Sequence, residues 1–269
     1  MTRKIAFIGG GNMATSLVGG LVESGHPPAS ILVSEPEADK RRDLAARFAV
    51  GVTADNREAA AASDVVVLAV KPQIMAEVVT GLAAAARDHG PLVVSIAAGT
   101  PIARILEWLD YPAPVVRTMP NTPALLGCGA TALFANDAVS DDQREAAEVV
   151  LRSAGIALWV EEEGLLDAVT AVSGSGPAYF FLLMEHMIRT GIGLGLSGEQ
   201  ARALTLQTAL GAARMALESG RAPEELRVGV TSPGGTTERA LELFREGGFG
   251  ELVEHALTGA CDRSRELGG

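Results

Sequence analysis

Apolar runs alternate with amphipathic stretches over the first 160 residues of the chain. The runs are short and rich in Val, Ile, Leu and Ala, as expected for buried strands of a parallel sheet. They occupy residues 4–9, 31–34, 64–70, 91–97, 113–118 and 156–160. Helical patterns lie between them at residues 13–24, 37–48, 73–86 and 101–109. Strands that alternate with such helices predict βαβ units in a doubly wound α/β fold.

The pattern changes after the acidic run at residues 161–163. Long helical patterns follow at residues 177–192, 197–219 and 250–267. We therefore predict a Rossmann-like dinucleotide-binding domain at residues 1–162 and an all-α substrate-binding and dimerisation domain at residues 163–269. The pattern at 197–219 is apolar most of the way round, which predicts burial. Its partner is either a second copy of the chain across a two-fold axis or the chain's own N-terminal domain.

Composition narrows the range of partners. The 269 residues are 48% hydrophobic and carry a formal net charge of −11. This charge, without any basic patch, argues against binding to nucleic acid or to an anionic membrane. Two distant cysteines indicate neither a disulfide framework nor a zinc cluster, and the first residues do not resemble a signal peptide. We expect a cytoplasmic protein that acts on a small molecule and holds no metal.

A glycine-rich loop follows the first apolar run. Gly9, Gly11 and Ala14 match the G-x-G-x-x-G/A spacing that places a dinucleotide pyrophosphate at a helix N-terminus. The carboxyl ends of the later strands should border the same crevice. The residues expected there are Ala69, Val70, Lys71, Pro72, Ala97, Ala98, Gly99, Met119, Pro120 and Asn121. The loop and these strand ends together predict a nicotinamide dinucleotide site.

The end of the second run bears on which nicotinamide cofactor binds. Glu35 stands where a carboxylate usually accepts a hydrogen bond from the ribose 2′-hydroxyl of NAD. Ser34 is small and polar, and the basic residues 40–42 either reach a 2′-phosphate or form a solvated helix face. Asn56 is either a helix cap or a ribose contact. These residues leave both NADH and NADPH open.

Common hydroxyacid reductases use a His or Lys to transfer a proton, and His186, on the predicted helix at 177–192, is more typical of an interior residue than of such an acid. The lysines of the chain are Lys4, Lys40 and Lys71, so the helical domain contains none, and no Ser/His/Asp or metal-ligand spacing occurs. An imine can be protonated in solution before the hydride arrives, so its reductase needs mainly position and charge complementarity. This favours an imine reductase over a β-hydroxyacid dehydrogenase, which would place a lysine in the helical domain. A non-catalytic dinucleotide sensor is the third interpretation.

Three stretches of small residues are suited to position a substrate. They are residues 115–127, residues 173–177 and residues 230–241. In the second, Ser175 or Gly176 is the expected cap of a helix that begins near Pro177. Small residues let a ligand approach free backbone N–H groups at a helix start, which suits a carboxylate. A dinucleotide sensor would explain the glycine loop but not these three stretches.

Five motifs extend a resemblance over the whole chain. They are GGGNMA at 9–14, AVKPQ at 69–73, MPNTPA at 119–124, DAVTAVSGSGPAYFF at 167–181 and TSPGGTT at 231–237. In these motifs the chain closely resembles the pyrroline-5-carboxylate reductase family. The resemblance implies reduction of 1-pyrroline-5-carboxylate to L-proline, the last step of proline biosynthesis. It also implies a homodimer, which in many members of the family assembles further into a decamer.

The resemblance also implies roles for individual residues, with the active site in the cleft between the two domains. The implied dinucleotide contacts are Ile8, Gly9, Gly10, Gly11, Asn12, Met13, Asn56, Ala69, Val70, Lys71 and Pro72. The implied substrate contacts are Ser175, Gly176, Pro177, Ser232, Gly234, Gly235, Thr236 and Thr237. Among them, Thr237 is the catalytic hydroxyl that bonds the ring nitrogen. NADPH is the expected cofactor, but Glu35 departs from the small polar residue common in NADPH-preferring relatives and leaves NADH open.

Overall fold

The computed structural model describes residues 2–268, which form two compact units. Residues 2–175 and 260–268 make up the first unit, and residues 176–259 make up the second. The sequence pattern placed its boundary near residue 162. Residues 163–175 lie in the first unit because the helix at 165–169 packs against strands β6 and β7, defined below.

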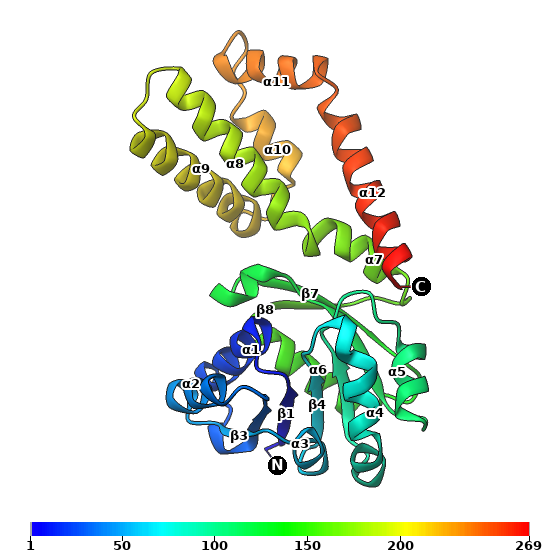
Figure 1. Cartoon of the computed structure of the whole chain (residues 1–269). Helices are drawn as coiled ribbons and strands as arrows, with labels where there is room; N and C mark the ends of the chain where they lie inside the picture. Colours follow the sequence, from blue (N-terminus) through cyan, green and yellow to red (C-terminus); the bar gives the residue numbers. More distant parts are fainter. Residues whose placement is uncertain (1, 269) are drawn as a thin grey trace. The chain divides into compact units, whose positions relative to one another are not determined.

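An eight-stranded sheet forms the centre of the first unit (Figure 1). Its strands are β1 Ile5–Ile8, β2 Ile31–Ser34, β3 Gly51–Thr53, β4 Val65–Leu68, β5 Leu92–Ser95, β6 Val115–Met119, β7 Gly129–Ala135 and β8 Gly155–Trp159. Their order is β3-β2-β1-β4-β5-β6-β7-β8, and the first six strands run parallel. This is the strand order of a Rossmann fold, so the predicted fold class is confirmed.

The last two strands differ from the prediction. β7 was not predicted, and it pairs antiparallel with β6, whereas the sequence pattern indicated parallel strands only. The expectation that residues 156–160 form a buried strand is also wrong, because Ile156 and Leu158 are 58% and 60% exposed. β8 is the edge strand of the sheet, and Ile156 and Leu158, two positions apart, point to the same exposed face.

Helices cover both faces of the sheet, which explains why β1 and β4 are buried along their whole length. The helices of the first unit are α1 Asn12–Glu23, α2 Ala38–Phe48, α3 Asn56–Ala61, α4 Pro72–His89, α5 Ile102–Leu109, α6 Asp141–Arg152 and α7 Leu165–Val169. Short 3-10 turns occur at η1 Pro28–Ser30 and η2 Thr122–Leu126. The four helices predicted for this unit are confirmed, whereas α3, α6 and α7 were not predicted.

The second unit is helical. It contains α8 Gly176–Gly193, α9 Gly198–Glu218, α10 Pro223–Gly229, α11 Thr236–Glu246 and the first part of α12 Phe249–Gly268. α8 and α9 pack together, yet Leu204 and Leu210 of α9 are 58% and 55% exposed. Much of α9 is therefore exposed within the second unit. Among residues 2–268, no helix is both long and apolar enough for a membrane span.

Candidate active site

The loop between β1 and α1 has the geometry of a pyrophosphate cradle. Gly9 has a φ of +101°, and a Cβ atom at this position would lie 2.7 Å from the carbonyl oxygen of Ala69. Gly11 is the N-cap of α1, and no atom lies within 4 Å of the place where its Cβ would be. The first backbone N–H of α1 that finds a carbonyl is that of Thr15, which donates to the carbonyl of Gly11. The N–H groups of residues 12–14 are therefore available to an anion.

The side chain of Glu35 is buried beneath this loop. It is 5% exposed, and its Oε2 accepts a hydrogen bond of 2.9 Å from the backbone N–H of Gly10. Its Oε1 accepts a second bond of 3.1 Å from the N–H of Glu37. Glu35 therefore holds the glycine loop in place, a role that the sequence pattern did not reveal. Its contact with a ribose hydroxyl stays a prediction.

Ser34 and Asn56 join the end of β2 to the start of α3. The hydroxyl of Ser34 donates a hydrogen bond of 2.6 Å to Oδ1 of Asn56. The cap of α3 is Asp55, whose side chain accepts the N–H of Arg57. The alternative in which Asn56 caps this helix is therefore wrong, and its contact with the ribose remains a prediction.

The three basic residues of α2 differ in their surroundings. Lys40 and Arg42 are exposed, and each pairs with an acidic residue three positions earlier. The hydrogen bond to its acidic partner raises the pKa of the Lys40 ammonium group above its usual value. Arg41 instead donates to the carbonyl oxygens of Glu35 and Pro36, at 2.6 and 2.7 Å. Two of the three residues therefore form a solvated face, and Arg41 lies against the loop that follows β2.

Four neighbouring parallel strands end at one edge of the sheet and bring the other predicted cofactor residues together. The strands are β1, β4, β5 and β6, and their carboxyl ends lead into Gly9, Ala69–Pro72, Ala97–Gly99 and Pro120. Lys71 is the N-cap of α4, which begins at Pro72. Residues that are up to 111 positions apart in the sequence therefore lie at the same end of the sheet, the end at which open α/β sheets bind their ligands.

Residues 173–177 do not form the loop that the sequence pattern predicted. α7 continues through a π turn at Thr170–Gly174 into α8, and the N–H of Ser175 donates to the carbonyl of Thr170 at 2.8 Å. α8 begins at Gly176, one residue before the expected start near Pro177, but Ser175 has helical backbone angles instead of capping a new helix, and its N–H is not free for a ligand. π turns often occur at functional sites, so the substrate role of this segment stays a prediction.

The π turn contacts the end of β6 within the first unit. The side-chain amide of Asn121 donates to the carbonyl of Ser173 at 3.0 Å, and its Oδ1 accepts the N–H of Ala130 at 2.9 Å. A Cβ on Gly174 would lie 2.4 Å from Cε of Met119, so a larger residue here would require the flexible end of this methionine to move. Asn121 therefore has a structural role, with both ends of its amide occupied. The motifs at 119–124 and 167–181 meet here.

In the second unit, the stretch at residues 231–237 forms a tight turn before α11. Pro233 is followed by Gly234 with a φ of +70°, and the N–H of Gly235 donates to the carbonyl of Ser232 at 3.0 Å. Proline followed by a residue with positive φ is the pattern of a type II turn. The N–H of Gly234 donates to Oε2 of Glu238 at 2.7 Å. The two glycine N–H groups expected to bind the substrate are therefore both occupied in this structure.

The first turn of α11 nevertheless offers donors. Gly235 is the N-cap without a side-chain cap, and the first backbone N–H of the helix that finds a carbonyl is that of Arg239. The N–H groups of residues 236–238 make no hydrogen bond with any residue from 2 to 268. Within the same range the half-buried hydroxyl of Thr237 has no partner either. Among the described residues, the first turn of α11 thus has three free N–H groups and the free hydroxyls of Thr236 and Thr237.

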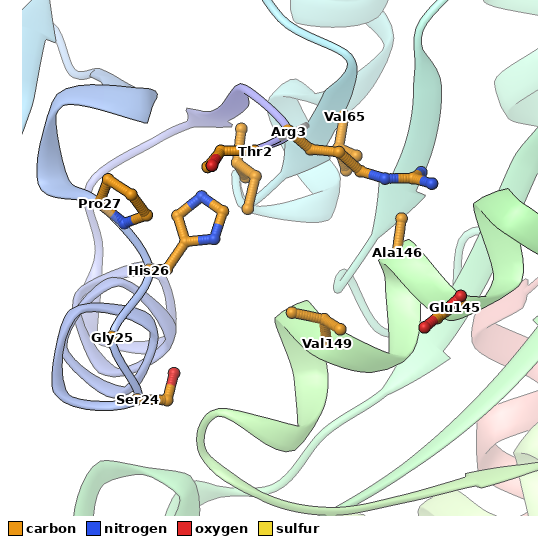
Figure 2. A pocket seen from close by; sticks show the side chains of 11 residues that line it. Thr2, Arg3, Ser24, Gly25, His26, Pro27, Val65, Glu145, Ala146 and Val149 are labelled. Carbon is orange, nitrogen blue, oxygen red and sulfur yellow. The ribbon is translucent and has the colours of Figure 1, made fainter.

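A cavity of about 420 Å³ lies away from these residues, at the amino ends of β1 and β4 (Figure 2). His26 lines it together with Arg3 and Glu145, and no described residue is within hydrogen-bond reach of its buried Nε2. None of the predicted site residues lines this cavity, so it is not part of the predicted active site. Among residues 2–268, no cluster of His, Cys, Asp and Glu side chains could hold a metal ion.

Comparison with known proteins decides the family. The family described as pyrroline-5-carboxylate reductase dimerisation matches residues 163–267. A pyrroline-5-carboxylate reductase of Pseudomonas aeruginosa is 57% identical over 266 residues, which cover 99% of this chain and 97% of that protein. The chain belongs to the pyrroline-5-carboxylate reductase family. The family described as NADP oxidoreductase, coenzyme F420-dependent, matches residues 4–99, which include the glycine loop.

Solved structures of pyrroline-5-carboxylate reductases have the same fold. That of Coxiella burnetii is 45% identical, covers 100% of both chains and superimposes with a TM-score of 0.97. That of Plasmodium falciparum, described with NADP bound, is 29% identical, covers 99% of this chain and 98% of its own, and has a TM-score of 0.86. The resemblance predicted from the five motifs is confirmed.

Proposed function

We propose that this chain transfers a hydride from NADPH to the C=N bond of 1-pyrroline-5-carboxylate and so forms L-proline, the last step of proline biosynthesis. The observation that carries the proposal is the 57% identity to a pyrroline-5-carboxylate reductase over nearly the whole chain. The absence of lysine between residues 163 and 269 argues against the hydroxyacid dehydrogenase alternative. NADH is the second candidate cofactor, because Glu35 places a carboxylate at the end of β2.

The substrate's carboxylate binds at the N-terminus of α11. The free N–H groups of residues 236–238 point out of the helix start, where the helix dipole favours negative charge. In this structure the carboxylate of Glu238 occupies the neighbouring N–H of Gly234. The substrate's carboxylate therefore replaces an internal carboxylate at this N–H when it binds. Ser232 and Gly235 shape the turn through their own hydrogen bond.

Thr237 orients the imine. Its hydroxyl is free and half-buried, one residue into α11, next to the N–H groups proposed for the carboxylate. The protonated ring nitrogen donates a hydrogen bond to this oxygen, which fixes the ring and stabilises its charge. NADPH supplies the hydride when it is bound. The protein contributes position rather than proton transfer, and positioning alone can contribute roughly 7 to 11 kcal/mol to a rate.

The first unit holds the dinucleotide. The N–H groups of residues 12–14 bind the pyrophosphate, and Gly9 and Gly11 leave the room that its approach requires. Ser34, Asn56 and Arg41 surround the end of β2, where a 2′-phosphate is read in folds of this class. This set of groups favours NADPH. The carboxylate of Glu35 counts against NADPH but is itself tied to the glycine loop.

The functional protein is a homodimer. The match of residues 163–267 to a dimerisation family supports a homo-oligomer, and the exposed apolar residues of α9 need cover. Association of five dimers into a decamer, and a cytoplasmic location, belong to the same proposal. The location is supported by the free cysteines Cys128 and Cys261, which suit a reducing compartment. Light scattering after gel filtration measures the assembly directly.

The proposal is tested by turnover. Purified protein is mixed with 1-pyrroline-5-carboxylate and either NADPH or NADH, and the nicotinamide absorbance is followed while proline is quantified. We expect proline to form in step with cofactor oxidation, with a higher kcat/KM for NADPH than for NADH. Folded protein that oxidises neither cofactor would rule out the proposed reaction. A higher kcat/KM with NADH would overturn the cofactor assignment alone.

A further inference from the structure

Asp167 opens the motif at residues 167–181, but no cofactor or substrate role accounts for it. Its Oδ1 accepts a hydrogen bond of 2.6 Å from the hydroxyl of Ser264, which lies 97 residues later on α12. Ser264 is 7% exposed, so this bond is largely shielded from water. A hydroxyl bound to a carboxylate at this distance makes a charge-assisted bond, stronger than a neutral one. The end of α12, red in Figure 1, lies beside α7, and this bond joins the two helices.

The same turns of α12 reach the loop after β5. A Cβ on Gly99 would stand 3.5 Å from the carbonyl oxygen of Leu267, and Gly99 has a φ of +71°. A cleft of about 690 Å³ is lined by Pro72 and Gly99 of the cofactor edge and by Leu267 and Gly268 of α12. These turns of α12, from Ala260 onward, belong to the first unit. The end of the helix thus backs a loop that the cofactor is proposed to contact.

Side-chain burial contributes little to holding this end of α12 in place. The side chain of Leu267 is 63% exposed, and the ion pair between Arg263 and Glu266 lies on the solvated face. Ser264 is the buried residue of α12, and its hydroxyl is the group that makes the bond to α7. The location of the last turn therefore depends strongly on the bond between Ser264 and Asp167.

We propose that Asp167 and Ser264 are positioning residues for the cofactor site. Their bond seats the end of α12 behind Gly99, and this backing keeps the loop after β5 in the conformation that binds the dinucleotide. The inference rests on the proposed function only in that a nicotinamide dinucleotide binds at this edge. Loss of the bond weakens the binding of NADPH. It does not affect the substrate's carboxylate, because α11 lies in the second unit.

Ser264→Ala tests the proposal on the full-length protein. The dissociation constant of NADPH is measured by nicotinamide fluorescence, and KM values are measured for both NADPH and the imine substrate. We expect a rise in the dissociation constant and KM of NADPH of roughly three- to tenfold, from the loss of one buried bond. The KM for the imine substrate and kcat should stay within about twofold of their wild-type values. Ser264→Thr, which retains the hydroxyl, should restore NADPH affinity.

A matched control and a local readout separate this role from a general loss of stability. Glu266→Gln alters the same turn on its solvated face and should leave NADPH binding unchanged. Hydrogen exchange of the peptide that contains Gly99 should be faster in Ser264→Ala than in Glu266→Gln. This measurement also serves Asp167→Ala if Ser264→Ala folds poorly.

Two outcomes would overturn the proposal. One is unchanged NADPH affinity together with unchanged exchange at Gly99 in Ser264→Ala. The other is an equal rise in both KM values, which would indicate a loosened protein rather than a displaced loop. NADPH titration needs no turnover, so a failure of the proposed reaction is seen separately, as wild-type protein that binds NADPH but does not form proline.

Discussion

The starts of α1 and α11 are built alike but differ in one respect. Each begins after a glycine turn, and in each a carboxylate accepts the N–H of a glycine in that turn, Gly10 to Glu35 at 2.9 Å and Gly234 to Glu238 at 2.7 Å. Glu35 is 5% exposed and lies under the loop, whereas the bond to Glu238 is exposed to solvent. A buried carboxylate is a permanent part of its loop, while an exposed one can be exchanged for a ligand.

Because of this difference in burial, the internal carboxylates of the two similar turns have different roles. At α1 the internal carboxylate supports the loop from behind and leaves the N–H groups of residues 12–14 free. At α11 the internal carboxylate lies on the side of the turn where the substrate's carboxylate is proposed to bind. A glycine-rich helix start is therefore not enough to identify an anion site. The burial of the internal carboxylate decides whether the N–H group that it occupies can be released to a ligand.

The largest effect should come from replacing one glycine in each turn by alanine. Gly9→Ala brings a Cβ within 2.7 Å of the Ala69 carbonyl at a φ of +101°, and we expect a loss of roughly 2 to 5 kcal/mol in unfolding free energy. Gly234→Ala meets no atom within 4 Å, so only its backbone conformation costs about 1 to 2 kcal/mol. Urea denaturation measures both. Equal losses would mean that the two turns are equally crowded.

Thr237→Ala should produce the next largest effect, on catalysis alone. Loss of the bond to the ring nitrogen should lower kcat/KM for the imine substrate by roughly 1 to 3 kcal/mol. Thr237→Ser retains the hydroxyl and should recover most of the activity. Steady-state kinetics with saturating NADPH provide the measurement. Unchanged kcat/KM in Thr237→Ala would remove this residue from the proposed mechanism.

Glu35→Gln tests the permanent carboxylate. The amide can accept one of the two N–H groups but not both, so unfolding free energy should fall by about 1 to 2 kcal/mol. Removal of the negative charge should also raise the preference for NADPH over NADH. Glu37→Gln is the matched control, because its ion pair with Lys40 is exposed and such pairs contribute little to stability. If both variants lose the same stability, the burial of Glu35 is not what distinguishes it.

Glu238→Gln tests the exchangeable carboxylate and should have the smallest effect. An exposed bond to a backbone N–H contributes about 0.5 to 1 kcal/mol, so its weakening should lower the KM for the imine substrate roughly two- to fivefold. Glu242→Gln, one turn further along α11, should leave this KM unchanged. A raised KM in Glu238→Gln would show that Glu238 assists substrate binding instead of competing with it.

Local patterns predicted the parts of the fold that depend on local rules. The alternation of apolar runs and helices predicted the Rossmann-like sheet, because strands buried on both faces must be apolar throughout. It missed β7, whose antiparallel pairing with β6 depends on the neighbouring strand rather than on its own composition. It also took β8 for a buried strand, because an apolar edge strand and an apolar central strand read alike.

Motifs in contiguous residues were enough to predict the family, the α/β class and the positions of the glycine turns, because each of these features is written in neighbouring positions of the chain. Only the folded structure shows which backbone N–H groups already donate to an acceptor within the protein. Folding placed Glu35 under Gly10, turned residues 170–174 into a π helix and joined Asp167 to Ser264. Each of these depends on contacts between residues distant in sequence or on backbone hydrogen bonds of unusual spacing. No pattern of hydrophobic and polar positions carries that information.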